Sequence, residues 1–283
     1  MSDGRLTERV YTSDAERERG MAVWRDMLAD LWAARELLWR LAHRDLTVSY
    51  RQSLLGFLWA LLMPLLTVML FAYLSSMRLV PIGATLLPYP VYALWGVVLW
   101  QLFAATLSAT TSSLANAGPL VTKVDFPKEV VVLSAVTRPL FEFAIKLLLV
   151  AVLMVIYDVS PGLSTWLLVP LVALTLAMAL GIGLVLSLAN LVVRDIGNLV
   201  GIVVMFGMFA APVLYPPPQT EPFTLLVVLN PFSPLLMASH DLLAGNPVAH
   251  PELLGASALF ALLCLGIGWR LFRVVIRRVT ERA

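Results

Sequence analysis

Two arginines stand immediately before the first long apolar run of the chain, in the stretch HRDLTVSYRQS. Arg44 and Arg51 are seven residues apart, or two helical turns, so on a continuous helix they share a face with Tyr50 and Ser53. Two forked guanidinium donors suit an anionic lipid head group. The adjacent Asp45 is expected to point elsewhere. Arginines beside a span are also an ordinary topology signal, and they can bind lipid phosphates or pair with another subunit, so these interpretations stay open.

The residue types that enzymes use are not grouped in this sequence. The three histidines, His43, His240 and His250, are scattered, and neither an HExxH motif nor a catalytic pair of carboxylates occurs. Asp241 follows His240, but neighbouring residues of a helix do not face each other. We therefore expect no catalytic residue and no metal site in this chain.

A P-loop for binding ATP is not expected either. Such a loop needs a lysine directly after a glycine, so that its ammonium group reaches the phosphates. The three lysines, Lys123, Lys128 and Lys146, follow Thr, Pro and Ile. We expect no cofactor in this chain, and any ATP-driven work must come from a separate subunit that holds the ATP and magnesium.

A charged stripe enters an apolar run where Arg138, Glu142 and Lys146 follow one another at one-turn spacing. Because an unpaired charge in hydrocarbon is costly, Glu142 and Lys146 are expected to neutralise each other and to face protein or water. The pair is either a structural ion pair or a polar lining of a transport path.

The composition is that of a protein that crosses a membrane several times. Of its 283 residues, 60% are hydrophobic and 13% are charged. A helix needs about 20 apolar residues to cross roughly 30 Å of hydrocarbon. Runs of this kind predict an all-α membrane protein with six transmembrane helices, near residues 54–74, 91–113, 140–156, 167–191, 199–214 and 253–272.

The distribution of Lys and Arg predicts how the spans are oriented. They gather in the N-terminal region, in the segment between the second and third spans, at Arg194 and in the C-terminal tail. The positive-inside rule then puts both termini in the cytoplasm of a protein of the cytoplasmic (inner) membrane.

The segment before the first span predicts an amphipathic helix over residues 24–46 that lies in the membrane interface, followed by a six-span domain over 47–283. Packing of this helix on a soluble partner is the alternative. Residues 1–23 are charged, are expected to be disordered, and have no role that we can derive. The apolar stripe of the helix consists of Trp24, Met27, Leu28, Leu31, Ala34, Leu38 and Leu41.

The stretch between the fifth and sixth spans, residues 215–247, is apolar but broken by prolines into pieces too short to cross a bilayer. A pair of re-entrant helices fits both properties, because non-helical backbone at membrane depth is tolerated where protein shields it.

Three stretches occur in a fixed order: RDLTVSYRQSLLGFLWALLMPLL, NAGPLVTKVDFPKEV and LYPPP…LNPFSP. Together they resemble the membrane (permease) subunit of ABC exporters of lipid-linked polysaccharide, of the O-antigen, teichoic acid or galactan type. The resemblance covers nearly the whole chain after about residue 30. It implies a homodimer with two separate ATPase subunits and a polyprenyl-pyrophosphate-linked glycan as cargo. With such a cargo, the face formed by Arg44, Tyr50, Arg51 and Ser53 is a candidate entry site for the pyrophosphate. It implies contact with membrane lipids and none with nucleic acid.

The resemblance also suggests site residues. The segment 116–130 is cytoplasmic by its charge, and Pro119 and Pro127 bracket a short helical piece, so we expect it to dock on the ATPase. The expected coupling residues are Asn116, Lys123, Asp125, Phe126, Pro127, Lys128 and Glu129. A channel lined by aromatic side chains that stack on sugar rings is implied, with the candidates Trp59, Tyr73, Trp95, Trp100, Phe206, Phe209 and Tyr215.

Two other classes of function remain open at this point. A small-molecule or drug efflux permease would share six spans, although it would explain the amphipathic helix and the arginines less readily. A membrane-embedded lipid-modifying enzyme would need a cluster of polar catalytic residues, which the sequence does not offer.

Overall fold

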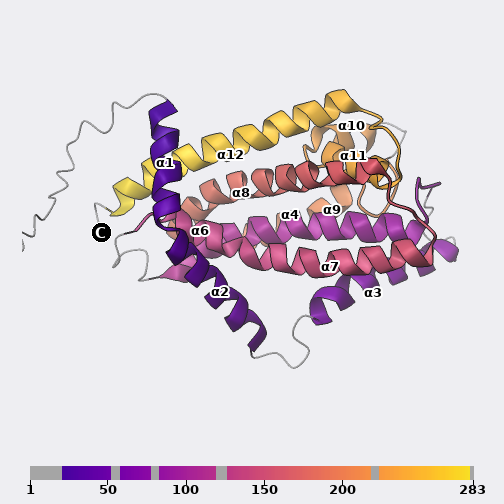
Figure 1. The fold of residues 1–283 in the computed structure, drawn as a ribbon, viewed down its shortest axis with the longest axis horizontal. Coiled ribbons are helices and arrows are strands. Elements are labelled where there is room, and N and C mark those ends of the chain that lie inside the picture. The colour runs from indigo at the N-terminus through magenta and orange to yellow at the C-terminus, as the bar shows by residue number, and fades with distance from the viewer. Residues whose placement is uncertain (1–20, 52–57, 78–82, 119–125, 218–222, 281–283) are drawn as a thin grey trace, which may run out of the picture.

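The computed structural model describes residues 21–51, 58–77, 83–118, 126–217 and 223–280, and every regular element within them is a helix. Figure 1 shows an elongated bundle whose long helices follow its longest axis. Five described stretches are long and apolar enough to cross a membrane: Leu58–Ser76, Tyr89–Ala117, Glu129–Ile156, Leu163–Val192 and Pro251–Ile276. The chain is therefore a multi-pass membrane protein whose described part is helical.

These five stretches correspond to five of the six predicted spans. They are formed by α3 (Leu58–Ser76), α4 (Tyr89–Ala117), α6 (Glu129–Ala135) with α7 (Thr137–Ile156), the 3₁₀ turn η2 (Leu163–Leu167) with α8 (Leu168–Val192), and α12 (Pro251–Thr280). The start of the first predicted span, residues 54–57, lies outside the described residues.

The break between α6 and α7 has a local cause. Pro139 has no N–H to donate to the carbonyl group of Ala135, and its ring would clash with that carbonyl in a continuous helix. Accordingly α6 ends at Ala135, and α7 begins again at Thr137.

The remaining predicted span, 199–214, differs from the expectation. Its helix, α9 (Asp195–Ala210), has 16 residues and falls outside the group of five long helices. At 1.5 Å per residue α9 is about 24 Å long, short of the roughly 30 Å of a hydrocarbon core. The chain leaves the helix at Ala210 and continues as buried, non-helical backbone over residues 211–214.

The segments rich in Lys and Arg meet at one end of the bundle. Figure 1 shows α1 (Met21–Ala33), α2 (Arg35–Arg51), α6 and the C-terminal part of α12 there, while α10 (Phe223–Leu229) and α11 (Ser233–Leu243) lie at the other end. We call these the basic end and the opposite end. The basic end also contains the α8–α9 turn, which carries Arg194.

The predicted amphipathic helix is present as two helices, α1 and α2, that change direction at Ala34 (Figure 1). Helical hydrogen bonding continues across the bend, because Ala34 N donates to Asp30 O and Leu38 N donates to Ala34 O.

The apolar stripe of this pair mostly contacts the chain itself. Met27 and Leu41 are buried, and Leu31, Ala34 and Leu38 pack on a cluster with α6 and α12, whereas Leu28 is exposed.

Helices α8 and α12 approach each other at backbone contact distance. A Cβ atom added at Gly181 would lie 2.3 Å from the carbonyl carbon of Cys264, and one at Gly268 would lie 2.2 Å from Gly181 O. Small residues allow this approach, and in a membrane close packing of this kind supplies much of the attraction between helices.

We predict that Gly181→Ala destabilises the protein, because the methyl group has only backbone atoms as neighbours and forces α8 and α12 apart. Overpacking of this type costs about 1–3 kcal/mol. The measurement is the thermal melting temperature in detergent. Gly255→Ala in α12 is the matched control, because a Cβ atom there meets nothing within 4 Å. Equal melting temperatures for the two variants would contradict the close contact.

Candidate functional site

The basic end has its own apolar core, which joins segments far apart in the sequence. Leu41 of α2, Leu114 of α4, Val130 of α6, Leu184 of α8 and Phe272 of α12 are all buried in one cluster. This core makes α2, α6 and the ends of three long helices a single packed unit.

Helix α1 is tied to α12 by two kinds of contact. The guanidinium group of Arg273 donates a hydrogen bond to the Asp30 carboxylate and forms an ion pair with it. The rings of Trp24 and Trp269 meet edge to face with centroids 6.0 Å apart. The outer side of the helix pair exposes Trp32 and other apolar side chains.

The structure corrects the expectation for Asp45. Its Oδ1 accepts hydrogen bonds from Arg44 Nε at 3.0 Å and from Arg44 Nη2 at 2.8 Å. The side chain therefore does not point away. A carboxylate one residue from a flexible guanidinium can curl back to it, even though adjacent side chains leave a helix in different directions. A pyrophosphate at Arg44 would have to compete with this ion pair.

The other members of the predicted pyrophosphate site are only partly visible. Residues 50 and 51 form the end of α2, with Arg51 as its last residue, so the two arginines do share one continuous helix. Ser53 lies outside the described residues. The exposed Arg44 side chain is thus the part of the site whose contacts are known.

The predicted coupling segment leads directly into the basic-end core. Lys128 Nζ lies 4.3 Å from the centre of the Phe126 ring, a cation–π contact, and both Lys128 and Glu129 are buried where α6 begins. Pro127 precedes them, and Asn116 is exposed in the last turn of α4. Lys123 and Asp125 lie outside the described residues.

The charged stripe on α7 forms a chain of three groups. Glu142 Oε1 accepts a hydrogen bond from Arg138 Nε at 2.9 Å, and Glu142 Oε2 lies 3.7 Å from Lys146 Nζ. The Lys146 side chain is only 7% exposed, against 57% for Arg138. The carboxylate therefore partners the buried ammonium group, as the spacing predicts.

The seven predicted channel aromatics divide into two groups. Trp95 and Trp100 are buried within the core, where Trp95 Nε1 donates to Ser239 Oγ at 2.7 Å and Trp100 packs on Phe232. In this conformation they offer no ring face to a sugar. The other group is exposed or half-buried: Trp59 and Tyr73 on α3, Phe206 and Phe209 on α9, and Tyr215 just after it.

Helix α11, in the segment between α9 and α12, is embedded in protein at the opposite end, whereas Leu225, Val228 and Leu229 of α10 are exposed. Every residue of α11 from Ser233 to Leu243 is buried except Met237, which is half-buried. His240 stacks on the Tyr92 ring at 3.9 Å, and its Nε2 is 3.0 Å from Tyr92 O, to which it donates. Burial lowers the pKa of His240 to about 4, so the ring is neutral near pH 7 and structural in role.

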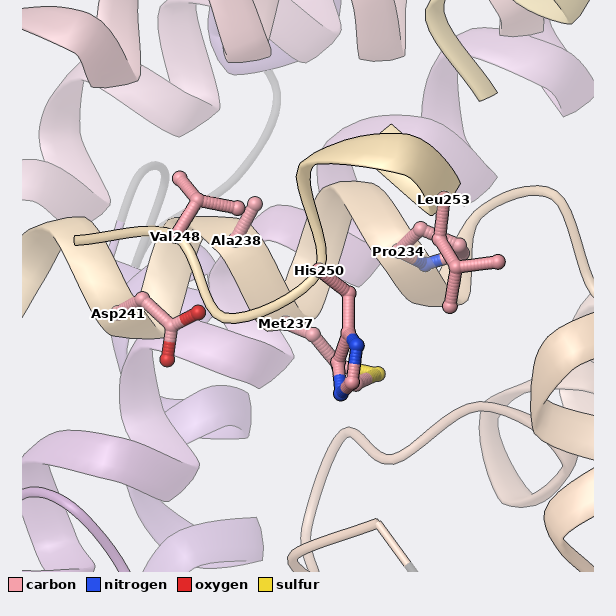
Figure 2. Close-up of a pocket in the computed structure, with 7 residues that line it drawn as sticks. All are labelled: Pro234, Met237, Ala238, Asp241, Val248, His250 and Leu253. Atoms are coloured by element: carbon pink, nitrogen blue, oxygen red, sulfur yellow. The ribbon is translucent and has the colours of Figure 1, made fainter. Parts of the chain in front are cut away.

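A small pocket beside α11 offers no catalytic grouping. Figure 2 shows residues of α11 on one side of it and residues leading into α12 on the other. The carboxylate of Asp241 already accepts a hydrogen bond from Ala249 N. Among the described residues no group of three His, Cys, Asp or Glu side chains could hold a metal ion.

Sequence reasoning missed Asn190, which links three helices. It is buried near the end of α8, and its Nδ2 donates to Thr111 O of α4 at 3.2 Å, while its Oδ1 accepts from Gly197 N of α9 at 2.8 Å. Its position, as an amide within the apolar stretch LSLANLVV, was the available signal.

We predict that Glu142→Gln destabilises the protein by about 3–5 kcal/mol, because it leaves the buried Lys146 ammonium group without its counter-charge. Glu142→Gln combined with Lys146→Met should recover most of the loss. Arg138→Gln is the control, and its effect should be small because Arg138 is exposed. Thermal melting in lipid nanodiscs measures all four proteins. A double variant no more stable than Glu142→Gln would contradict the pairing.

Comparison with known proteins agrees with this arrangement. The sequence pattern of the ABC-2 type transporter family matches residues 36–242 of this 283-residue chain. The O-antigen export system permease protein RfbA of Myxococcus xanthus is 28% identical over 242 residues, which is 84% of this chain and 92% of that protein.

Two proteins of the same name from Klebsiella pneumoniae are also similar. One is 27% identical over 209 residues, covering 73% of this chain and 80% of the relative. The other is 25% identical over 248 residues, covering 87% and 94%. Because the family match extends from α2 to α11 and takes in most of the chain, this protein belongs to the ABC-2 type transporter family.

Proposed function

We propose that this chain is the permease subunit of an ATP-driven exporter that moves a polyprenyl-pyrophosphate-linked polysaccharide across the cytoplasmic membrane. Membership of the ABC-2 type transporter family and the similarity to proteins named as O-antigen export permeases support this function. The transporter contains two copies of this chain and two ATPase subunits, which bind the ATP and magnesium.

In this proposal the basic end faces the cytoplasm. Helix α9 and the buried backbone over 211–214 together form the sixth crossing, so that six crossings return both termini to the same side. Two contacts support this assignment, because they put Gly197 near one end of α4 and Pro212 near the other. Asn190 bridges Gly197 to Thr111 O, and Tyr92 Oη donates to Pro212 O.

The main structural support for the proposed mechanism is that α2 and α6 pack in the same apolar core. The carrier's pyrophosphate binds at Arg44 and Arg51 on α2, and the ATPase docks on the segment 116–130 that leads into α6. Movement of the docking segment is transmitted to α2 because the two helices share buried side chains. The exposed aromatics of α3 and α9 then face the passage between the two copies, where they stack on sugar rings.

The test of this function is reconstitution of the chain with its ATPase in lipid vesicles, with lipid-linked glycan on one side. We expect ATP-dependent arrival of glycan on the other side. A fluorescent drug-like dye in place of the glycan tests the efflux alternative. Dye transport without glycan transport would replace our proposal by a small-molecule permease, and chemical change of the lipid without transport would indicate an enzyme.

We predict that Arg44→Lys raises the concentration of undecaprenyl pyrophosphate needed for half-maximal stimulation of ATP hydrolysis by about tenfold. Lysine keeps the charge but loses the forked donor. Asp45→Asn should lower that concentration, because it removes the carboxylate that holds the guanidinium group. If both variants behave like the wild type, this stretch serves topology alone.

We also predict that Phe126→Ala lowers the stimulation of the ATPase by the membrane subunit by a factor of about 2–5, because it removes the ring under Lys128. Val192→Ala, an exposed side chain at the end of α8, is the control and should have no effect. The measurement compares ATP hydrolysis by the complex with hydrolysis by the ATPase alone. Equal stimulation by Phe126→Ala, Val192→Ala and the wild type would remove Phe126 from the coupling element.

A further inference from the structure

Helix α9 rests on the protomer by a narrow stripe. Val200 is its only buried residue, and Val204, Gly207 and Met208 pack partly on the core. The remainder of the helix is apolar and exposed, including Leu199, Ile202, Val203, Met205, Phe206 and Phe209. A helix with so few inward contacts is held chiefly at its two ends.

The opposite end of α9 is fixed by several independent contacts. Tyr92 Oη lies 3.3 Å from Pro212 O and 3.1 Å from Tyr215 O, and Tyr89 Oη donates to Leu214 O at 3.1 Å. Gly96 presses on Val213, since a Cβ atom there would lie 2.3 Å from Val213 O. Displacement of this end of α9 would therefore break the tyrosine hydrogen bonds together.

The basic end of α9 is attached differently. The first N–H groups of a helix have no acceptor within it. One of these, Gly197 N, donates to Asn190 Oδ1 at 2.8 Å, and the same amide donates to Thr111 O at 3.2 Å. A single buried side chain therefore joins the start of α9 to both α8 and α4.

We infer that α9 pivots about its opposite end, and that Asn190 is the positioning residue that holds its basic end against α4 and α8. The inference rests on the proposed function, in which α9 borders the passage. Release of the Asn190 bridge lets the basic end of α9 move away from α4. The basic end of α9 then moves into the passage and narrows it on the side that faces the ATPase, while the opposite end of α9 stays held to α4 by its tyrosine contacts.

Hydrogen–deuterium exchange of the complete transporter in nanodiscs tests this inference. Asn190→Leu should increase exchange in residues 196–200 by about fivefold, the factor expected for the loss of one buried hydrogen bond, and leave 210–214 unchanged. Asn198→Leu is the matched control, because Asn198 is exposed on the same turn. Unchanged exchange at 196–200 in Asn190→Leu would overturn the role of Asn190.

A second pair of variants guards against misfolding of Asn190→Leu. A Cβ atom at Gly197 would lie 3.2 Å from Asn190 Oδ1, whereas one at Gly201 meets nothing within 4 Å. Gly197→Ala crowds the bridge while improving helix propensity, and should raise exchange at 196–200 in the same direction. Gly201→Ala should not. Equal exchange in these two variants would count against the bridge as firmly as the first result.

The pivoting movement of α9 is tested by trapping the wild-type complex with a non-hydrolysable ATP analogue. Exchange should rise at 196–200 and stay constant at 210–214; a rise confined to 210–214, or no change in either segment, would overturn the pivot. In the transport assay Asn190→Leu should consume about fivefold more ATP per glycan exported. The exchange measurements do not depend on the cargo, so they decide the inference even if the proposed glycan is wrong.

Discussion

The burial of α4 is the constraint on which the other helices depend. In the most apolar 18-residue stretch of α4, 83% of the residues are buried, against 11% in the corresponding stretch of α3 and 22% in that of α12. A membrane helix that does not face lipid must be surrounded by other helices, and here α3, α7, α8, α9 and α11 all pack on it. The buried hydroxyl groups of Thr110 and Thr111 donate to carbonyl groups of their own helix, whereas that of Thr106 has no hydrogen-bond partner.

A second constraint acts at the end of α9, because the helix ends at Ala210, before the end of the predicted span 199–214. Carbonyl groups released by the end of a helix need donors when lipid surrounds the protein. Tyr89 and Tyr92 reach across from α4 to the non-helical backbone, Tyr215 Oη donates to Phe209 O at 2.7 Å, and Asn230 Nδ2 approaches Ala210 O at 3.4 Å. The non-helical backbone after α9 is therefore stabilised by donors from α4 and from the neighbouring loops.

Much of this arrangement could be predicted from the sequence, because the absence of charge over about 20 residues reflects the bilayer itself. Four of the five long spans lie within a few residues of the expected positions, and the third, predicted over 140–156, begins earlier, at Glu129, because α6 precedes α7. The directions in which side chains point could be predicted less well. Periodicity identified the apolar face of α1 and α2, but not that this face covers α6 and α12. Nor does residue type distinguish a core tryptophan such as Trp95 from an exposed one such as Trp59. The Arg44–Asp45 pair depends on rotamers, which spacing does not determine.

The contacts of the basic end join its parts unequally. Apolar packing links α2 to α6 continuously, whereas α1 meets α12 through the Asp30–Arg273 ion pair and the two tryptophans. Apolar contacts are non-directional and survive small sliding motions, but an ion pair and a bridging amide are made or broken over short distances. A push on α6 would thus carry α2 with it as one body. Phe272 and Ile276 place α12 in the same core, so the Asp30–Arg273 ion pair adds a directional contact between α1 and α12, whereas the Asn190 bridge is the discrete bond that joins α9 to α4 and α8.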